Sequence, residues 1–331
     1  MMLLVTGGKE RKDANKLEEW QRYKCALILH LDINQNNIKI IKCFEYVSPP
    51  EVCPNKNPSI AFRAGTLKKD KLYICTSTEV IIFSLPKFTK VGYISLPVFN
   101  DIHHVALSPK GNIIVVNTGL DMVLEMNLKG KIINEWSVIG ENIWRRFNKN
   151  VDYRKMPTTK PHKSHPNYAF YLKDQLWITR FEQKDAICLK DFSKKINIKI
   201  GHPHDGIVKG DFIYFTTVNG YIVIVNAQTL KVEEIYDLNE ITKSKIALGW
   251  CRGISIIDQN KIWVGFSRLR PTPFQEHINW LKGNLGLKDW RNLPTRIVEY
   301  DLFNKKLLEE FNLENFGLHT IFSIHLINNE I

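Results

Sequence analysis

Short apolar runs bounded by polar turns fill this chain, and few stretches show the period of an amphipathic helix. The runs fall into pairs that recur about every 40 residues. The first runs of the pairs are Leu72–Thr76, Ile113–Asn117, Leu176–Arg180, Ile213–Thr217 and Ile262–Phe266. The second runs are Val80–Ser84, Val123–Asn127, Ala186–Lys190, Tyr221–Asn226 and Arg296–Asp301. Strand groups with this period are typical of β-propeller blades, so the pattern predicts an all-β fold.

The two ends of the chain supply complementary parts of a further blade. Five blades are expected to start near residues 60, 103, 165, 204 and 252. The apolar run 320–327 has no strand after it, whereas the N-terminal runs 3–7, 26–32 and 38–44 lack an innermost strand. Joined, they complete a sixth blade that starts near residue 319, and this closure removes the exposed edges of the array. We therefore predict a single domain over residues 1–331, a six-bladed β-propeller whose last blade is closed by the N- and C-terminal strands.

Three insertions interrupt the regular pattern, at about 8–22, 141–163 and 268–295. The first and third fall between the second and third strands of a blade, and the middle one joins a fourth strand to the next inner strand. In an up-and-down blade, both kinds of connection lie on the face where the inner strands begin. Long loops on a rigid scaffold often carry function. We therefore expect a functional site on this face.

Histidines mark the same face. His104, His165, His204 and His319 each lead an expected inner strand. Arg252 leads another, and Arg63 lies near the start of the remaining one. Inner strands surround the central channel of a propeller, so residues at equivalent points of these strands converge on one place. The pattern predicts a site lined by histidine and arginine at one mouth of the channel.

Charge and composition indicate which classes of molecule the protein binds. The chain has 46 Lys and Arg against 34 Asp and Glu, a formal net charge of +12, yet no RNP-like aromatic box, helix-turn-helix or long basic run. We therefore expect a small anionic substrate and no nucleic acid. The six cysteines lack metal-binding spacing, and no stretch approaches the roughly 20 apolar residues of a membrane span. A cytoplasmic protein without membrane contact is expected, with its oligomeric state open.

A metal site is one chemistry that suits such a ring of imidazoles. His104, His165 and His204, with His319 as a further ligand, could bind a transition metal such as zinc or iron and leave a coordination position open. Asp205, next to His204, could orient a ligand histidine by a hydrogen bond to the ring nitrogen that does not bind the metal. This interpretation predicts a metal-dependent oxygenase, lyase or hydrolase.

Histidine catalysis without any cofactor is the second chemistry. Here His204, His165 and His104 act as nucleophile or as general acid and base. Polar side chains near them would bind the anionic substrate, namely Asn167, Arg180, Arg252, His319 and Asp205. Polar residues near a propeller axis also satisfy backbone groups, so a third interpretation is a non-catalytic scaffold that binds partners through the insertion-rich face.

Part of the sequence resembles the arylsulfotransferase-like propellers. The resemblance covers about residues 102–206 and rests on His165-Pro-Asn167, on Arg180 at the end of the next strand, and on His204-Asp205. It implies that His204 accepts the sulfate group, that His165, Asn167 and Arg180 bind sulfate, and that His104 is a further site histidine. These roles coincide with the second chemistry.

Over nearly its whole length the chain resembles uncharacterised bacterial six-bladed propeller proteins. The shared strings are Ser164–Tyr168, Arg180–Ala186, His204–Gly206 and Gly265–Arg270. This resemblance implies the fold and the same face, without a reaction. Combining both, we expect an enzyme acting on a small anionic substrate by histidine-based group transfer, with a metal-dependent enzyme and a scaffold as the alternatives.

Overall fold

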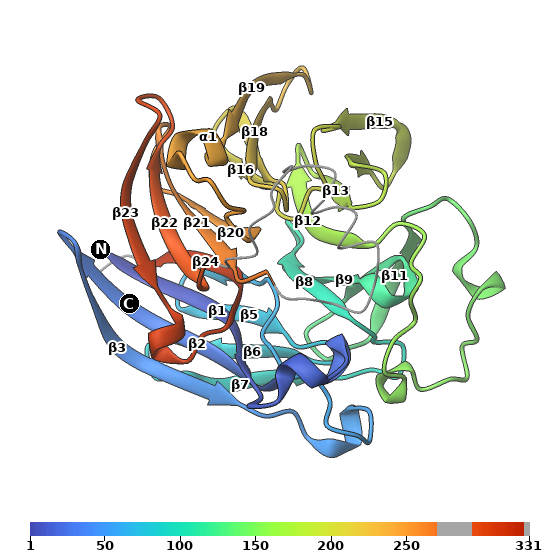
Figure 1. The fold of residues 1–331 in the computed structure, drawn as a ribbon. Coiled ribbons are helices and arrows are strands. Elements are labelled where there is room, and N and C mark those ends of the chain that lie inside the picture. The colour runs from blue at the N-terminus through green and yellow to red at the C-terminus, as the bar shows by residue number, and fades with distance from the viewer. Residues whose placement is uncertain (270–292, 328–331) are drawn as a thin grey trace.

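The computed structural model describes residues 1–269 and 293–327, which form six four-stranded antiparallel sheets around a common axis (Figure 1). Each sheet is one blade, so the predicted six-bladed β-propeller is confirmed. The innermost strands of neighbouring blades contact one another, as between β8 (Ile102–Leu107) and β12 (Pro166–Leu172). The beginnings of these inner strands therefore surround one mouth of the axis.

Five blades take their strands in chain order from the axis outward. The first contains β4 (Thr66–Lys68), β5 (Lys71–Cys75), β6 (Val80–Ser84) and β7 (Thr89–Ile94). The second contains β8, β9 (Ile113–Asn117), β10 (Met122–Met126) and β11 (Ile132–Ser137). The third contains β12, β13 (Gln175–Arg180), β14 (Asp185–Cys188) and β15 (Asp191–Asn197). The fourth contains β16 (Ile207–Lys209), β17 (Phe212–Thr216), β18 (Tyr221–Asn226) and β19 (Val232–Asp237). The fifth contains β20 (Trp250–Ile256), β21 (Lys261–Ser267), β22 (Arg296–Asp301) and β23 (Lys306–Asn312).

The sixth blade joins the two ends of the chain, as predicted. Its strand order is β24 (Thr320–Ile327), β1 (Met2–Glu10), β2 (Tyr23–Asn34) and β3 (Asn37–Tyr46). Gly7 lies at an irregularity in the pairing of β1 with β24, and a Cβ there would lie 1.7 Å from the carbonyl oxygen of Thr320. Only glycine allows the two strands to approach so closely at this point.

The hydrophobic core lies between the blades. Each pair of neighbouring blades encloses its own cluster of buried apolar side chains. Between the sixth and first blades, for example, Ile28 packs with Ile74 and Phe83. Apolar contacts therefore hold the blades together. The space along the axis is lined by both apolar and polar side chains, among them Ile254, Asp205 and His325.

Helices are few and short. The one α-helix of the described residues is α1 (Leu238–Thr242). The 3₁₀ helices are η1 (Ala14–Lys16), η2 (Glu19–Gln21), η3 (Pro50–Val52), η4 (Thr118–Leu120), η5 (Ile143–Arg145), η6 (Tyr153–Lys155) and η7 (Glu314–Phe316). None of the helices in this part of the chain is long and apolar enough to cross a membrane.

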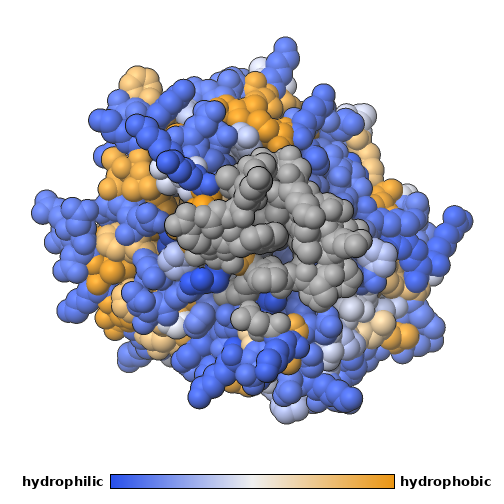
Figure 2. Space-filling model, viewed as in Figure 1, coloured by the Kyte–Doolittle hydropathy of each residue, from blue (hydrophilic) through white to orange (hydrophobic). Residues whose placement is uncertain are grey.

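Two of the predicted insertions meet above the histidine-bearing mouth. The connection between β1 and β2 carries Glu19, and the connection between β11 and β12 carries Lys160; their charged groups are 2.6 Å apart. Most of the third insertion, residues 270–292, lies outside the described residues. The face seen in Figure 2 is largely hydrophilic at its rim, with hydrophobic side chains in small separate groups.

Candidate functional site

Four histidines gather where the inner strands of three blades begin. His103 lies near the start of β8, His165 precedes β12, and His204 precedes β16. His162 comes from the long connection before β12. The ring centroid of His103 lies 4.8 Å from that of His165 and 6.4 Å from that of His204. The ring centroids of His162 and His165 are 5.0 Å apart. His103 therefore links the two predicted site residues, His165 and His204.

The predicted site residue His104 lies apart from this group. Its ring stacks on Tyr168 at 3.7 Å, and its Nδ1 accepts the amide hydrogen of Ala169. Successive side chains of a strand point in opposite directions, and the pairing of β8 shifts between Ile102 and His104. The place predicted for His104 is consequently occupied by its neighbour His103.

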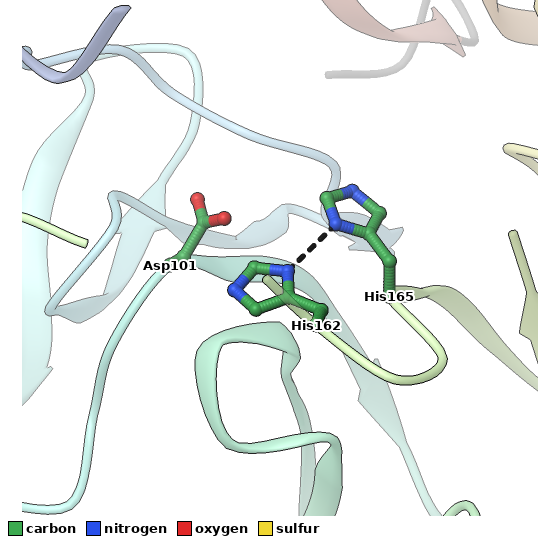
Figure 3. Close-up of side chains that lie close together, drawn as sticks. All are labelled: Asp101, His162 and His165. Atoms are coloured by element: carbon green, nitrogen blue, oxygen red, sulfur yellow. Dashed lines mark hydrogen bonds between the residues drawn. The ribbon is translucent and has the colours of Figure 1, made fainter. Parts of the chain in front are cut away.

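Asp101, His162 and His165 form the tightest group of potential metal ligands (Figure 3). One ligand atom from each residue lies within 4.8 Å of those of the other two. Nδ1 of His162 and Nδ1 of His165 are 2.8 Å apart and share a hydrogen bond. A carboxylate with two imidazoles is a donor set that zinc and iron(II) accept. Among the described residues, this group is therefore the one that could hold a metal ion.

Asp121 holds the loop that carries two of these side chains. Its buried carboxylate accepts the amide hydrogens of Lys163, Ser164 and His165. His165 and Asp101 have φ values of +52° and +48°, in the left-handed region that residues with a Cβ rarely adopt. Such conformations persist where the surroundings fix them, and they concentrate at functional sites. The backbone of the group is thus fixed by contacts outside it.

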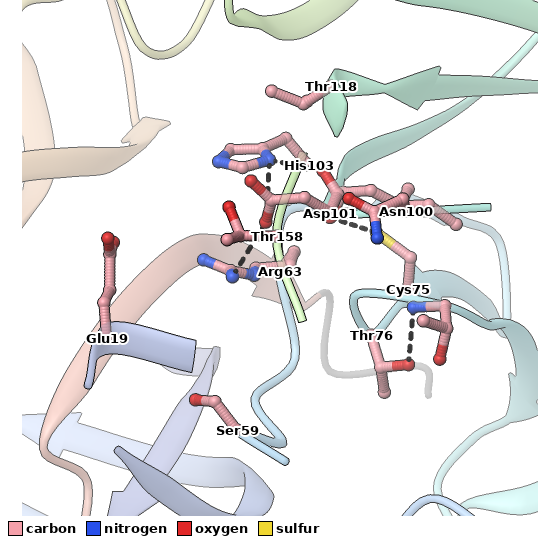
Figure 4. A network of polar contacts seen from close by, with 12 residues as sticks. Glu19, Ser59, Arg63, Cys75, Thr76, Asn100, Asp101, His103, Thr118 and Thr158 are labelled. Atoms are coloured by element: carbon pink, nitrogen blue, oxygen red, sulfur yellow. Dashed lines mark hydrogen bonds and ion pairs between the residues drawn. The ribbon is translucent and has the colours of Figure 1, made fainter. Parts of the chain in front are cut away.

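Asp101 lies among cationic and imidazole groups (Figure 4). The Arg63 guanidinium donates to its Oδ1 at 3.2 Å, and His103 Nδ1 donates to its backbone carbonyl at 2.8 Å. Burial alone would raise the pKa of the Asp101 carboxyl. Electrostatic interactions with His103 and Arg63, and to a smaller extent with His162 and His165, instead hold this pKa far below its usual value. Asp101 is therefore ionised at neutral pH.

The imidazoles at the mouth are neutral at pH 7. Burial and, after it, the neighbouring His162 lower the pKa of His165 to about 3. Burial also lowers the pKa values of His162, His103 and His204. Neutral imidazole is the form that binds metals and attacks electrophiles. The protonation states at the mouth thus suit both predicted chemistries.

His204 and Asp205 form a buried pair on the fourth blade. His204 Nδ1 lies 3.4 Å from Asp205 Oδ1, and Oδ2 of the same carboxylate accepts from the Thr216 hydroxyl and the Gly253 amide. His204 Nε2 is buried without a hydrogen-bond partner. Burial would raise the pKa of Asp205, but His204 and its other hydrogen-bond donors lower it. Asp205 also lines a cavity of about 180 Å³ along the axis, with Tyr168 and residues of β4, β16, β20 and β24.

Two arginines lie against one aromatic ring beside His204. The guanidinium carbons of Arg252 and Arg63 are 3.9 and 4.5 Å from the ring centroid of Phe322, which itself lies 6.2 Å from the His204 ring. Arg252 also donates to the Thr320 hydroxyl at 2.7 Å. Burial lowers the pKa of His204, Asp205 opposes this effect, and the charges of the two arginines add to the lowering. In the described part of the mouth, two guanidinium groups and the Asp205 carboxylate therefore lie near His204.

Other predicted site residues have structural partners. Arg180 binds Asp185 through two hydrogen bonds of 2.8 and 2.7 Å and donates to the Val138 carbonyl. Asn167 donates to the Pro203 carbonyl, and its Oδ1 is buried without a hydrogen-bond partner. His319 Nδ1 lies 2.7 Å from the Gly317 carbonyl at the start of the sixth blade. The structure does not bring Arg180 or His319 into the group around His103.

Sequence reasoning missed Asp101 and His103, and it gave no site role to Arg63 or to the insertion residue His162. A signal existed for three of them. His103 belongs to a histidine doublet, of which only one member can face the mouth. His162 lies three residues before His165, so a turn can bring their rings together. Arg63 lies near the start of another inner strand, which is the signal that marked the histidines, whereas nothing in the sequence pattern pointed to Asp101.

Comparisons with known proteins identify the fold alone. No protein-family model matches the chain, and no curated protein matches its sequence. A solved structure described as a protein of unknown function from Bacteroides caccae matches with a TM-score of 0.61 at 14% sequence identity. The match covers 98% of this chain and 97% of that one. The chain is thus similar over nearly its whole length to a protein whose function is also unknown.

Proposed function

We propose that the protein is an enzyme that transfers a small anionic group, with His204 as the residue that accepts it. The observation that carries the proposal is the state of the His204 ring: Nδ1 is held by Asp205, whereas Nε2 is buried without a hydrogen-bond partner. A buried polar atom left unpaired costs about 1–3 kcal/mol. An Nε2 lone pair that is kept available beside a charged mouth suits a nucleophile.

The arginines support an anionic group as the one transferred. Arg252 and Arg63 place two guanidinium groups beside the His204 ring, against Phe322. Guanidinium groups bind sulfate, phosphate and carboxylate oxygens in a planar geometry and stabilise charge that develops on them. The resemblance to arylsulfotransferase-like propellers favours a sulfuryl group. Arg180, which that resemblance assigned to sulfate, is paired with Asp185 outside the group around His103. Arg252 lies beside His204 and takes this role in the proposal.

The reaction proceeds in two displacements at His204. In the first, the Nε2 lone pair forms a bond to sulfur while the donor oxygen–sulfur bond breaks, and the released phenolate takes a proton from water. In the second, an acceptor hydroxyl attacks the sulfur and loses its proton to solvent, which restores neutral His204. Asp205 holds the ring and stabilises its positive charge in the intermediate.

A chromogenic aryl sulfate tests the proposal. We expect the protein to release 4-nitrophenolate from 4-nitrophenyl sulfate, faster with an added phenol, and to carry one sulfuryl group on His204 in peptide mass spectra. His204→Ala should abolish both signals. His202→Ala is the matched control, because the His202 ring stacks on Phe181 and bonds its carbonyl. A wild-type protein that neither releases 4-nitrophenolate nor gains a sulfuryl group on His204 contradicts the proposal.

A further inference from the structure

We infer that Asp101, His162 and His165 bind one divalent transition-metal ion, zinc or iron(II), at the same mouth. This site goes beyond the proposed transfer reaction, which needs no metal. It also differs from the ligand set expected from the sequence, in which four strand-leading histidines shared the ion. Only His165 is common to both sets. Two imidazoles with one carboxylate leave coordination positions open for water or substrate.

The spacing of the two imidazole nitrogens suits a shared ion. Nδ1 of His162 and Nδ1 of His165 are 2.8 Å apart. Two nitrogens that each lie about 2.1 Å from an ion are about 3.0 Å apart when they subtend a right angle at it. Figure 3 shows the Asp101 carboxylate beside these rings. Small shifts of the side chains therefore suffice to place an ion among the three groups.

Thr159 fixes the orientation of the His162 ring through the ring nitrogen that faces away from His165, Nε2. Its hydroxyl donates to the Gly119 carbonyl at 2.5 Å and lies 3.3 Å from His162 Nε2. Since the single hydroxyl proton is used on Gly119, the oxygen accepts from Nε2–H, which leaves the Nδ1 lone pair directed at His165. Metal-binding histidines typically have such a partner on their second nitrogen.

The hydrogen bond between the two Nδ1 atoms points to the same conclusion. With the His162 Nδ1 as acceptor, the His165 Nδ1 carries the proton between them. An ion that replaces this proton gains two ligands from groups that already face each other. The left-handed backbone at Asp101 and His165, and the grip of Asp121 on the loop, hold the three residues in place before any ion arrives.

The inferred ion lies next to the proposed transfer residue. The His103 ring is 4.8 Å from that of His165 and 6.4 Å from that of His204, so it stands between the two groups. Arg63 donates to Asp101 and also packs on Phe322 beside His204. An anion bound at the arginines is therefore close enough to the cluster for an ion to attract its charge.

Metal binding by the full chain tests the inference without any substrate. Protein stripped with a chelator is dialysed against zinc, and elemental analysis should find about one ion per chain. Isothermal titration should give the same stoichiometry. Asp101→Asn and His162→Ala should each weaken zinc binding at least 100-fold, while melting curves report whether the variants remain folded. Iron(II) titrated under nitrogen provides the second probe.

His202→Ala and His204→Ala are the controls, and both should bind zinc like the wild type. The second control separates the two proposals, because it abolishes sulfuryl transfer while leaving the metal site intact. A stripped wild type that takes up neither zinc nor iron(II) at micromolar concentration would overturn the inference. Folded Asp101→Asn and His162→Ala proteins with unchanged affinity would overturn it as well.

Discussion

The two groups of polar residues at the mouth use imidazole in different ways. In the cluster of Asp101, His162 and His165, two ring nitrogens face each other across 2.8 Å. In the pair of His204 and Asp205, the carboxylate holds one ring nitrogen and the other is buried without a partner. Facing nitrogens suit a bound ion, whereas a single oriented nitrogen suits attack on a substrate.

The difference also extends to how the chain supports each group. The cluster depends on the long connection before β12, which Asp121 and Thr159 fasten to the second blade. The pair is fastened within the blades, by Thr216 of β17 and the Gly253 amide of β20. One mouth therefore combines a group that depends on an insertion with a group held by the blades themselves. A substitution that impairs one group should leave the function of the other unchanged.

The largest effect should come from removing what both groups share, the closed ring. Ending the chain at Leu318 removes β24, which pairs with β1 and contributes Ile321 and Ile324 to the core. The remaining sheets would expose edges and apolar faces, so we expect global unfolding. Circular dichroism and a melting curve measure this. A truncated protein that retains its cooperative transition would show that the two groups do not depend on closure.

Asp205→Asn should damage only the His204 pair. The amide no longer favours the ring form with Nδ1–H, so turnover should fall about 10²- to 10⁴-fold. Zinc binding should stay at the wild-type level. Thr216→Val is the control, because it removes both hydrogen bonds between the Thr216 hydroxyl and Asp205 but leaves the carboxylate that contacts His204. If Asp205→Asn also lost zinc, the two groups would form a single site.

Thr159→Val should damage only the cluster. The valine side chain has a similar shape but cannot accept from His162 Nε2, and loss of such outer partners weakens metal binding about 10- to 100-fold. Isothermal titration with zinc measures the effect. Thr158→Val provides the neighbouring control and should leave the affinity unchanged. Equal affinities for Thr159→Val and the wild type would remove the positioning role of Thr159.

The smallest effects should separate two arginines. Arg180→Lys loses the paired hydrogen bonds to Asp185, so we expect a stability loss of about 1–3 kcal/mol with an unchanged KM. Arg252→Lys should instead raise KM for the aryl sulfate roughly tenfold, which is about 1.4 kcal/mol. Urea denaturation and initial rates measure the two effects. A raised KM for Arg180→Lys at unchanged stability would return this residue to the anion site.

The fold could be predicted from local pattern because each blade repeats the same pattern of strands and turns. The runs 72–76 and 113–117 coincide closely with β5 and β9, and the run 320–327 is β24. The N-terminal runs lack an inner strand, and the C-terminal end has one isolated strand. Together they predicted that the two ends of the chain form the sixth blade. Periodicity carries this information because the strands of a blade lie close together in sequence.

The site could be predicted only in part, because it depends on the direction in which each side chain points and on contacts that form only in the folded chain. His165 and His204 were found since they lead inner strands. The choice between His103 and His104 required the irregular pairing of β8, which sequence spacing does not reveal. Arg180 looked available because its partner Asp185 lies on the adjacent strand, and its ion pair forms only in the folded blade.

A crystal structure of the protein soaked with zinc and sulfate tests the central claim of two neighbouring groups most directly. Anomalous scattering should locate one zinc ion bound by Asp101, His162 and His165. Sulfate should bind to the Arg252 guanidinium, next to His204 Nε2. Zinc bound elsewhere on the chain, or sulfate absent from the mouth, would contradict the account.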